Sequence, residues 1–327
     1  MNLVATYGIF DLLGDKTPRG ERNEFMDKLI LIEEIKRLKK EKNAVVLAHH
    51  YQVEEVKEVA DIIGDSLELS RKATEVQEQT IVLSGVHFMA ESVKILSPNK
   101  KVLLPVKDAG CPMADMIDEE KLEAFKARHP TGKVVCYVNT SAEVKAKSDI
   151  CCTSSNALKV VNSLGEDPVL FIPDQNLGNY VKKYSGNKNV IPYNGYCITH
   201  HRARKEDALK AKAKHPEGLL LAHPECQEEV LEEADFIGST TAIINYAENS
   251  ENQTFIIGTE MGVVESLKKQ LPNKTFYLLA QSFICSNMKK TRLEDVYRAL
   301  KKDTYEIQID EQTLQEAKST LVNMLAL

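Results

Sequence analysis

Short, mostly apolar runs alternate with amphipathic segments along most of this chain. The runs at 44–48, 80–83 and 101–105 lack the polar alternation of a half-buried strand, and such runs are typical of strands buried on both faces of a parallel sheet. Between and before them, apolar residues at helical spacing predict helices at 25–41 and 53–63. The alternation predicts a three-layer α/β unit whose ligands bind at the carboxyl ends of the strands.

The same order of elements recurs twice, with new units beginning at the apolar runs 134–139 and 219–222. Polar residues at the ends of the three first strands are separated by 88 and 86 residues, and a hydroxyl residue stands 17 positions past each of them. The strand-end residues are His49, Tyr137 and His223, and the hydroxyl residues are Ser66, Ser154 and Thr240. We interpret this as an internal triplication of domain-sized units.

The repeat predicts where the domains begin and end. We expect three homologous α/β/α domains in a pseudo-threefold arrangement around a shared centre, followed by two helices at about 291–301 and 311–324 that pack on the outside. The expected divisions are an N-terminal arm at 1–23, domains at 24–110, 111–197 and 198–290, and the C-terminal helices at 291–327.

Three cysteines recur at nearly the same position in each repeat, and they are candidate ligands at the shared centre. Cys111, Cys197 and Cys285 follow the three strand ends by 62, 60 and 62 residues. A structural zinc site normally closes with four protein ligands, and the chain has no Cys-x₂-Cys pair. Three thiolates suit a cubane iron–sulfur cluster with one open iron. A free cysteine usually fills space in a buried core, but the shared offsets favour a ligand role for these three. We assign the other four cysteines to core packing.

Polar side chains at and just beyond the strand ends predict a pocket for a small anionic substrate. They are His49, Tyr51, Tyr137, Asn139, His223 and Glu225. As the carboxylate of that set, Glu225 is the candidate general base, although it could instead cap a helix that begins near Gln227. The three repeated hydroxyls could likewise be helix N-caps, a role that is compatible with binding a carboxylate or phosphate at a helix N-terminus.

Bulk composition limits the partners. The formal net charge is −6, which argues against a general nucleic-acid surface. No apolar run reaches the ~18 residues that a membrane-spanning helix needs, and no secretion signal begins the chain. Seven cysteines, thinly spread and odd in number, indicate a reduced, cytoplasmic protein.

With these residues assembled, the chain from about 44 to 290 resembles the quinolinate synthase family of bacterial NAD biosynthesis. The resemblance rests on Leu47-Ala48-His49-His50-Tyr51-Gln52, Gly64-Asp65-Ser66, Tyr137-Val138-Asn139-Thr140-Ser141, Cys152-Thr153-Ser154-Ser155-Asn156-Ala157, His223-Pro224-Glu225-Cys226 and Gly238-Ser239-Thr240. It rests further on Ala109-Gly110-Cys111-Pro112-Met113-Ala114, Gly195-Tyr196-Cys197 and Cys285-Ser286-Asn287-Met288-Lys289.

This resemblance implies three α/β domains that meet around a [4Fe–4S] cluster held by the three cysteines. It implies condensation of iminoaspartate with dihydroxyacetone phosphate to quinolinate, with an L-aspartate oxidase or aspartate dehydrogenase supplying the iminoaspartate, and with the open iron acting as a Lewis acid. The catalytic residues it implies are Glu225, Tyr51, Tyr137 and His49. The substrate-binding residues it implies are His49, Ser66, Tyr137, Val138, Asn139, Ser154, His223, Glu225 and Thr240.

Two other interpretations stay open at this stage. A non-enzymatic sensor with three cysteines would need neither Glu225 nor the repeated hydroxyls, and would typically carry a basic stripe or a nucleic-acid-binding helix pair, neither of which the sequence shows. A different hydro-lyase would share the open iron and select another substrate. A radical-type enzyme is disfavoured, because its three cysteines would lie within one short loop.

Overall fold

The computed structural model describes residues 19–327. Positions 1–18 of the predicted N-terminal arm therefore lie outside the described residues, and positions 19–23 belong to helix α2 (Arg19–Glu41). This helix begins six residues before the predicted start at 25. Its first turns are polar in sequence, so apolar periodicity gave no signal for their position.

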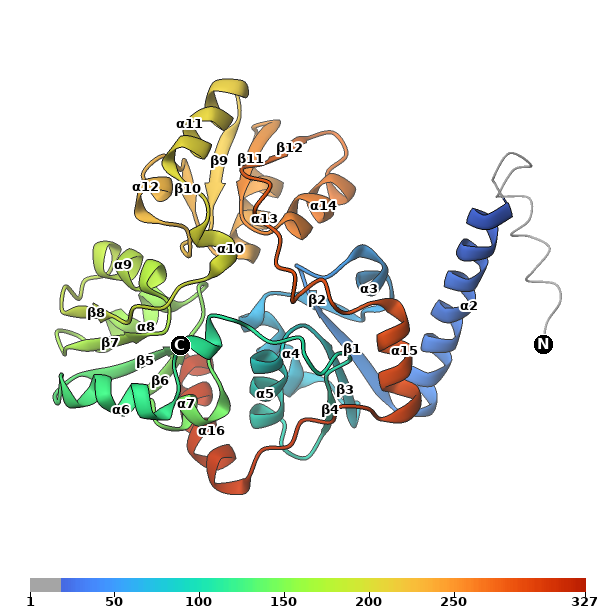
Figure 1. Ribbon diagram of the computed structural model, residues 1–327, viewed down its shortest axis with the longest axis horizontal. Coiled ribbons are helices and arrows are strands. Elements are labelled where there is room, and N and C mark those ends of the chain that lie inside the picture. Colours follow the sequence, from blue (N-terminus) through green and yellow to red (C-terminus); the bar gives the residue numbers. More distant parts are fainter. Residues whose placement is uncertain (1–18) are drawn as a thin grey trace.

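Three separate sheets of four parallel strands form the frame of the molecule (Figure 1). The first has the order β2-β1-β3-β4, built from Ile62–Gly64, Ala44–His49, Thr80–Ser84 and Lys101–Leu103. The second has the order β6-β5-β7-β8, built from Ile150–Cys152, Lys133–Tyr137, Val169–Ile172 and Val190–Pro192. The third has the order β10-β9-β11-β12, built from Phe236–Ile237, Leu219–Ala222, Thr254–Gly258 and Thr275–Leu278. The order is the same in each sheet, as an internal triplication requires.

Helices accompany each sheet and complete the α/β fold that the sequence predicts. The first unit contains α3 (Glu54–Val59), α4 (Ser66–Glu75) and α5 (His87–Leu96). The second contains the 3₁₀ helix η1 (Ala114–Met116), α6 (Glu119–Ala127), α7 (Ala142–Ala146), α8 (Ala157–Ser163) and α9 (Gln175–Tyr184). The third contains α10 (Ile198–His201), α11 (Lys205–Lys214), α12 (Glu228–Leu231), α13 (Thr240–Asn249) and α14 (Met261–Gln270). Each sheet lies within one of the predicted domains, while the domain boundaries themselves stay a prediction.

The predicted helix at 53–63 is wrong in its second half. Helix α3 ends at Val59, and Ile62 then pairs with Leu47 of β1 in the parallel edge strand β2. The reason is Asp61, whose carboxylate accepts the backbone N–H of Val46 at 2.8 Å. That bond brings the chain against the sheet, so the apolar pair after it continues as a strand.

This aspartate contact occurs once in every unit. In each, the carboxylate accepts an N–H of the first strand at 2.7 to 2.8 Å, and the aspartate's own N–H donates back to the same residue. The pairs are Asp61 with Val46, Asp149 with Val134, and Asp235 with Leu220. Each aspartate follows its strand-end residue by 12 positions. The triplication therefore extends to individual hydrogen bonds.

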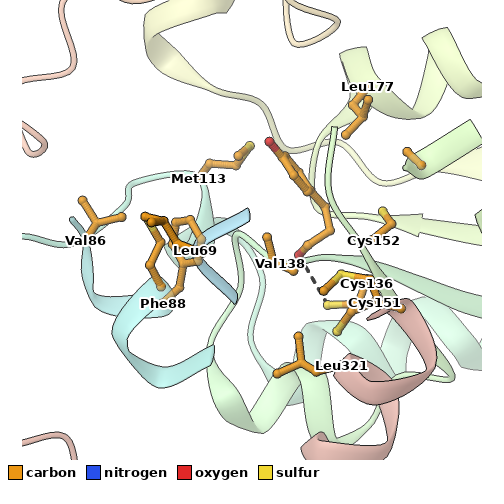
Figure 2. Close-up of a cluster of buried hydrophobic side chains, with 14 of the residues drawn as sticks. Leu69, Val86, Phe88, Met113, Cys136, Val138, Cys151, Cys152, Leu177 and Leu321 are labelled. Carbon is orange, nitrogen blue, oxygen red and sulfur yellow. Dashed lines mark hydrogen bonds between the residues drawn. The ribbon is translucent and has the colours of Figure 1, made fainter. Parts of the chain in front are cut away.

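The two C-terminal helices cover different parts of the molecule (Figure 1). Helix α15 (Leu293–Lys302) packs against α2, and α16 (Glu311–Ala326) contacts α7 and β6 of the second unit as well as α5 of the first. Figure 2 shows Leu321 of α16 close to Cys136 and Cys151 of the second sheet. Leu321 and both cysteines are fully buried, so α16 completes the core of the second unit.

Within residues 19–327, no helix combines the length and the apolar character that crossing a bilayer requires.

Candidate functional site

A cavity of about 230 Å³ lies where the carboxyl ends of the strands of all three units meet. His49 ends β1, Tyr137 ends β5, and His223 directly follows β9. Twelve of the residues that the sequence singled out line the cavity. They are His49, Tyr51, Ser66, Cys111, Tyr137, Asn139, Ser154, Cys197, His223, Glu225, Thr240 and Cys285.

Val138 is the exception among the residues expected at the substrate. Its side chain is 1% exposed and does not line the cavity. Successive side chains in an extended segment point to opposite sides, so Tyr137 and Asn139 face the cavity while Val138 faces the apolar core shown in Figure 2. Its backbone N–H donates to the Cys152 carbonyl at 2.9 Å, which holds this segment against β6.

The three cysteines of the repeat converge on the cavity, and each follows the last strand of one sheet. Cys111 is therefore counted with the first unit, Cys197 with the second and Cys285 with the third, although the predicted boundary at 110/111 places Cys111 in the second domain. All three are free thiols. Burial raises the pKa of Cys111 to about 12 and raises the pKa of Cys197 and of Cys285, and neighbouring thiols add to the shift at Cys111 and Cys197. Three thiols that line one cavity become thiolates only when a cation compensates their charge. The donor set therefore fits a cluster held by three thiolates, with the cavity open beside it.

The other four cysteines, Cys136, Cys151, Cys152 and Cys226, are fully buried and do not line the cavity. Their position agrees with the packing role expected from the repeat.

Glu225 lies at the centre of the polar side chains. Its Oε1 accepts the Tyr137 hydroxyl at 2.7 Å, and its Oε2 lies 2.7 Å from His200 Nδ1. Burial alone would raise the pKa of Glu225, but the neighbouring imidazoles of His223 and His200 and the hydrogen bonds from His200 and Tyr137 hold it well below its ordinary value. The carboxylate is therefore ionised at neutral pH. The alternative of a helix cap is wrong, because Gln227 occupies the N-cap of α12.

His200 extends this network toward the first unit, although it was not among the site residues predicted from the sequence. Its Nε2 lies 3.0 Å from Thr259 Oγ1, which lies 2.9 Å from the Tyr51 hydroxyl. The signal was present in the sequence: His200 is three residues past Cys197 in a helical segment, a spacing that places both side chains on one face. His200 Nδ1 lies 3.2 Å from Cys197 Sγ.

Two histidines at the strand ends are neutral donors. Burial lowers the pKa of His49 to about 3 and that of His223 to about 4, so neither carries a proton charge at neutral pH. In both rings Nδ1 accepts the backbone N–H two residues further on, from Tyr51 at 3.1 Å and from Glu225 at 3.3 Å. A neutral imidazole that accepts at Nδ1 carries its hydrogen on Nε2. Each ring therefore carries an Nε2–H donor, and that of His223 lies 3.2 Å from Ser154 Oγ.

The repeated hydroxyls are not helix N-caps, so that alternative is wrong. Asp65 caps α4 and Ser239 caps α13, while α8 begins after Asn156. The hydroxyl residues Ser66, Ser154 and Thr240 remain at the cavity wall.

Asn139 supplies an independent sign of a ligand. Its Oδ1 is buried and has no hydrogen-bond partner among the described residues. Because an unsatisfied buried polar group costs free energy, the atom is suited to a substrate group bound in the cavity.

The site also contains the elements of a mononuclear metal site. Ligand atoms of Cys197, His200 and Glu225 lie within 4.8 Å of one another. His200 already uses Nδ1 toward Glu225 and Nε2 toward Thr259, however, so a single ion at this place would displace an existing contact.

Comparison with known proteins gives a consistent result. The family described as "Quinolinate synthetase A protein" matches residues 33–326. A protein named quinolinate synthase from Alkaliphilus metalliredigens is 58% identical over 300 residues, which cover 92% of this chain and 99% of that protein. One from Caldicellulosiruptor saccharolyticus is 55% identical over 294 residues, covering 90% and 97%. One from Clostridium kluyveri is 53% identical over 302 residues, covering 92% and 100%.

Proposed function

This chain belongs to the quinolinate synthetase A family, and on that premise we propose that it condenses iminoaspartate with dihydroxyacetone phosphate to give quinolinate for NAD biosynthesis. One carbon–carbon bond and one carbon–nitrogen bond form, and phosphate and two waters leave. No oxidant is consumed. The observation that carries the proposal is the convergence of one free thiol from each unit on a cavity that also holds an ionised Glu225.

We propose Cys111, Cys197 and Cys285 as the ligands of a [4Fe–4S] cluster. When bound, such a cluster supplies an open iron that acts as a Lewis acid on a substrate hydroxyl. The remaining tasks fall to side chains of the cavity wall. Apolar side chains of the lining, such as Val86, Phe88 and Met113, exclude water from the cavity.

Binding of the anionic groups falls to neutral donors. The Nε2–H groups of His49 and His223 and the hydroxyls of the repeat suit carboxylate and phosphate oxygens. Asn139 adds an amide, and Arg202 brings a positive charge to the cavity lining.

Proton transfer falls to the network around Glu225. Burial raises the pKa of Tyr51 and of Tyr137 well above the ordinary value, so both hydroxyls keep their protons at neutral pH. Tyr137 donates to Glu225, and Tyr51 is linked to His200 through Thr259. We propose that Glu225 accepts a proton from the substrate and that Tyr51 donates one.

An anaerobic assay with iminoaspartate and dihydroxyacetone phosphate, read as quinolinate formed, tests the reaction. The Cys197→Ala variant should lose the brown colour and the activity together, whereas Cys151→Ala, a buried cysteine away from the cavity, should keep both. Iron analysis should give about four iron atoms per chain. One zinc and no iron would favour the mononuclear arrangement, and an active Cys197→Ala protein without iron would refute the ligand assignment.

Substrate and partner assignments have their own tests. A different hydro-lyase would retain the cluster and form no quinolinate from these two substrates. Because iminoaspartate hydrolyses readily, we propose that an L-aspartate oxidase or aspartate dehydrogenase supplies it in the cytoplasm. A coupled assay with either enzyme should produce quinolinate from aspartate, and no product in either coupling would contradict this supply.

A further inference from the structure

Each cysteine loop is tied by the same backbone hydrogen bond to one helix of its own unit, the helix that joins the last two strands of the sheet in chain order: α5, α9 or α14. The first N–H of the helix donates to a carbonyl that lies two residues before the cysteine, at 2.8 to 2.9 Å. The pairs are His87 with Ala109, Gln175 with Gly195, and Met261 with Phe283. The cysteine loops therefore share an anchor that follows from the triplicated fold.

Two of the three units add a carboxylate at this anchor. In the second unit, Asp174 caps α9: its Oδ1 accepts the N–H groups of Asn176 at 2.7 Å and Leu177 at 3.0 Å. Its Oδ2 accepts the N–H of Cys197 at 3.1 Å. One oxygen thus holds the helix, and the other holds the cysteine.

The third unit repeats the arrangement with a longer side chain. Glu260 caps α14, where its Oε2 accepts the N–H of Gly262 at 2.7 Å and its Oε1 accepts the N–H of Cys285 at 3.3 Å. Lys289 approaches the same Oε2 at 3.2 Å and also donates to the Tyr51 carbonyl at 2.7 Å. The anchor of Cys285 is therefore linked to the strand end of the first unit.

Helix capping alone does not explain these two carboxylates. Both side chains are fully buried, and a buried carboxylate is costly where a neutral Ser or Asn would cap as well. The first unit shows that the fold does not need one, because Val86 is the N-cap of α5 and makes no side-chain cap. Asp174 and Glu260 differ from an ordinary cap because their second carboxylate oxygen accepts the backbone N–H of a cysteine.

We propose that Asp174 and Glu260 are positioning residues that orient Cys197 and Cys285 toward the central cavity. Each carboxylate bridges a helix N-terminus and the backbone of a cysteine, so the thiol direction is set by a rigid element of its unit. This proposal rests on the proposed function only for the identity of the group that the thiols hold. Cys111, opposite Val86, lacks such a bridge among the described residues, and its loop should be the most easily displaced of the three.

The Asp174→Asn variant tests the bridge while preserving the size of the side chain. The amide has one oxygen and one NH₂ group, so its oxygen can accept either the helix N–H groups or the Cys197 N–H, but not both. When the oxygen faces the helix, the cap is kept and the contact with Cys197 is lost. We expect cluster iron to pass to a chelator about ten-fold faster than from the unsubstituted protein, with an altered electron paramagnetic resonance signal of the reduced cluster. The matched control is Asp118→Asn, a cap of α6 whose carboxylate contacts the N–H and the ammonium of Lys121 and no cysteine, and which should release iron at the unsubstituted rate.

Thiol reactivity in cluster-free protein separates this proposal from the proposed function. Alkylation followed by mass spectrometry should show Cys197 several-fold more reactive in Asp174→Asn, and Cys285 several-fold more reactive in Glu260→Gln, with each variant leaving the other cysteine unchanged. Circular dichroism should show the helices intact in both. Unchanged alkylation rates and unchanged iron release in two folded variants would overturn the proposal. If the two variants change thiol reactivity as expected but the protein forms no quinolinate, the positioning role stands and only the proposed reaction is refuted.

Discussion

At the scale of single residues, the site depends on burial that leaves some groups charged and others neutral. Glu225 is ionised because the hydrogen bonds and imidazoles around it outweigh its desolvation, whereas burial keeps His49 and His223 neutral. The same cavity therefore offers one proton acceptor among several neutral donors. This division suits the proposed substrate, which carries carboxylates and must lose protons.

We expect Glu225→Gln to retain the cluster and to lower kcat by at least about 100-fold, the usual contribution of a general base. The amide accepts from Tyr137 but cannot take up a proton. Single-turnover and steady-state rates of quinolinate formation, with iron content measured on the same samples, provide the test. A rate within a few-fold of the unsubstituted protein would show that Glu225 is not the base.

A companion change addresses Tyr51. The Tyr51→Phe variant removes the hydroxyl that contacts Thr240 and Thr259 but keeps the ring. We expect a fall in kcat with little change in iron content, because the ring still fills its place in the core. Equal activity in Tyr51→Phe would remove Tyr51 from the proton path.

At the scale of elements, the strand-to-aspartate contact holds each edge strand beside its first strand. Asp149 is partly exposed, with a side-chain exposure of 42%, yet it satisfies the buried N–H of Val134. Its ion pair with Lys133, at 3.6 Å on the surface, contributes little. The value of Asp149 therefore lies in the backbone group that it satisfies.

We expect Asp149→Ala to lower the free energy of unfolding by about 1 to 3 kcal/mol, the cost of a buried donor left without a partner. Asp149→Asn, which keeps an acceptor oxygen, should recover part of this loss. Denaturant unfolding under anaerobic conditions measures both. Asp167→Ala, at an exposed aspartate in the same unit, is the control and should be close to neutral. Equal stability of the Ala variant and this control would contradict the assigned role.

At the scale of the whole molecule, the three units share one centre and bury titratable groups at it. His49, His50 and His223 have pKa values that burial lowers to about 3, 4 and 4, compared with an ordinary value of 6.5. An unfolded chain would bind these protons near pH 6.5, and the folded chain would not. The stabilising difference is fully present above pH 6.5 and is lost as the pH falls toward 4.

We therefore expect stability to fall on acidification from pH 7 to pH 5, with a slope of up to about 1.4 kcal/mol per pH unit for each proton taken up. His50→Gln removes one of these groups and should make the dependence less steep. Denaturant unfolding at several pH values, on anaerobic samples, measures the slopes. An unchanged slope in His50→Gln would show that His50 does not contribute.

The sequence by itself determined the elements and their repetition. The buried strands at 44–48, 80–83 and 219–222 were confirmed, and equal spacings located three cysteines at one cavity. Both results follow from local physics: apolar runs must be buried, and repeated units place equivalent residues at equivalent positions. The edge strand Ile62–Gly64 was not predicted, because three residues are too few to show a periodic pattern.

Only the tertiary structure decided which groups meet. Contacts of His200 with Glu225, of Asp174 with Cys197 and of Glu260 with Cys285 join segments that lie 23 to 25 residues apart. The burial of the Val138 side chain away from the cavity likewise depends on the apolar core against which it packs. Hydrogen bonds of this kind depend on how loops and strand ends pack in three dimensions, and the spacing of residues along the chain does not determine which of them meet.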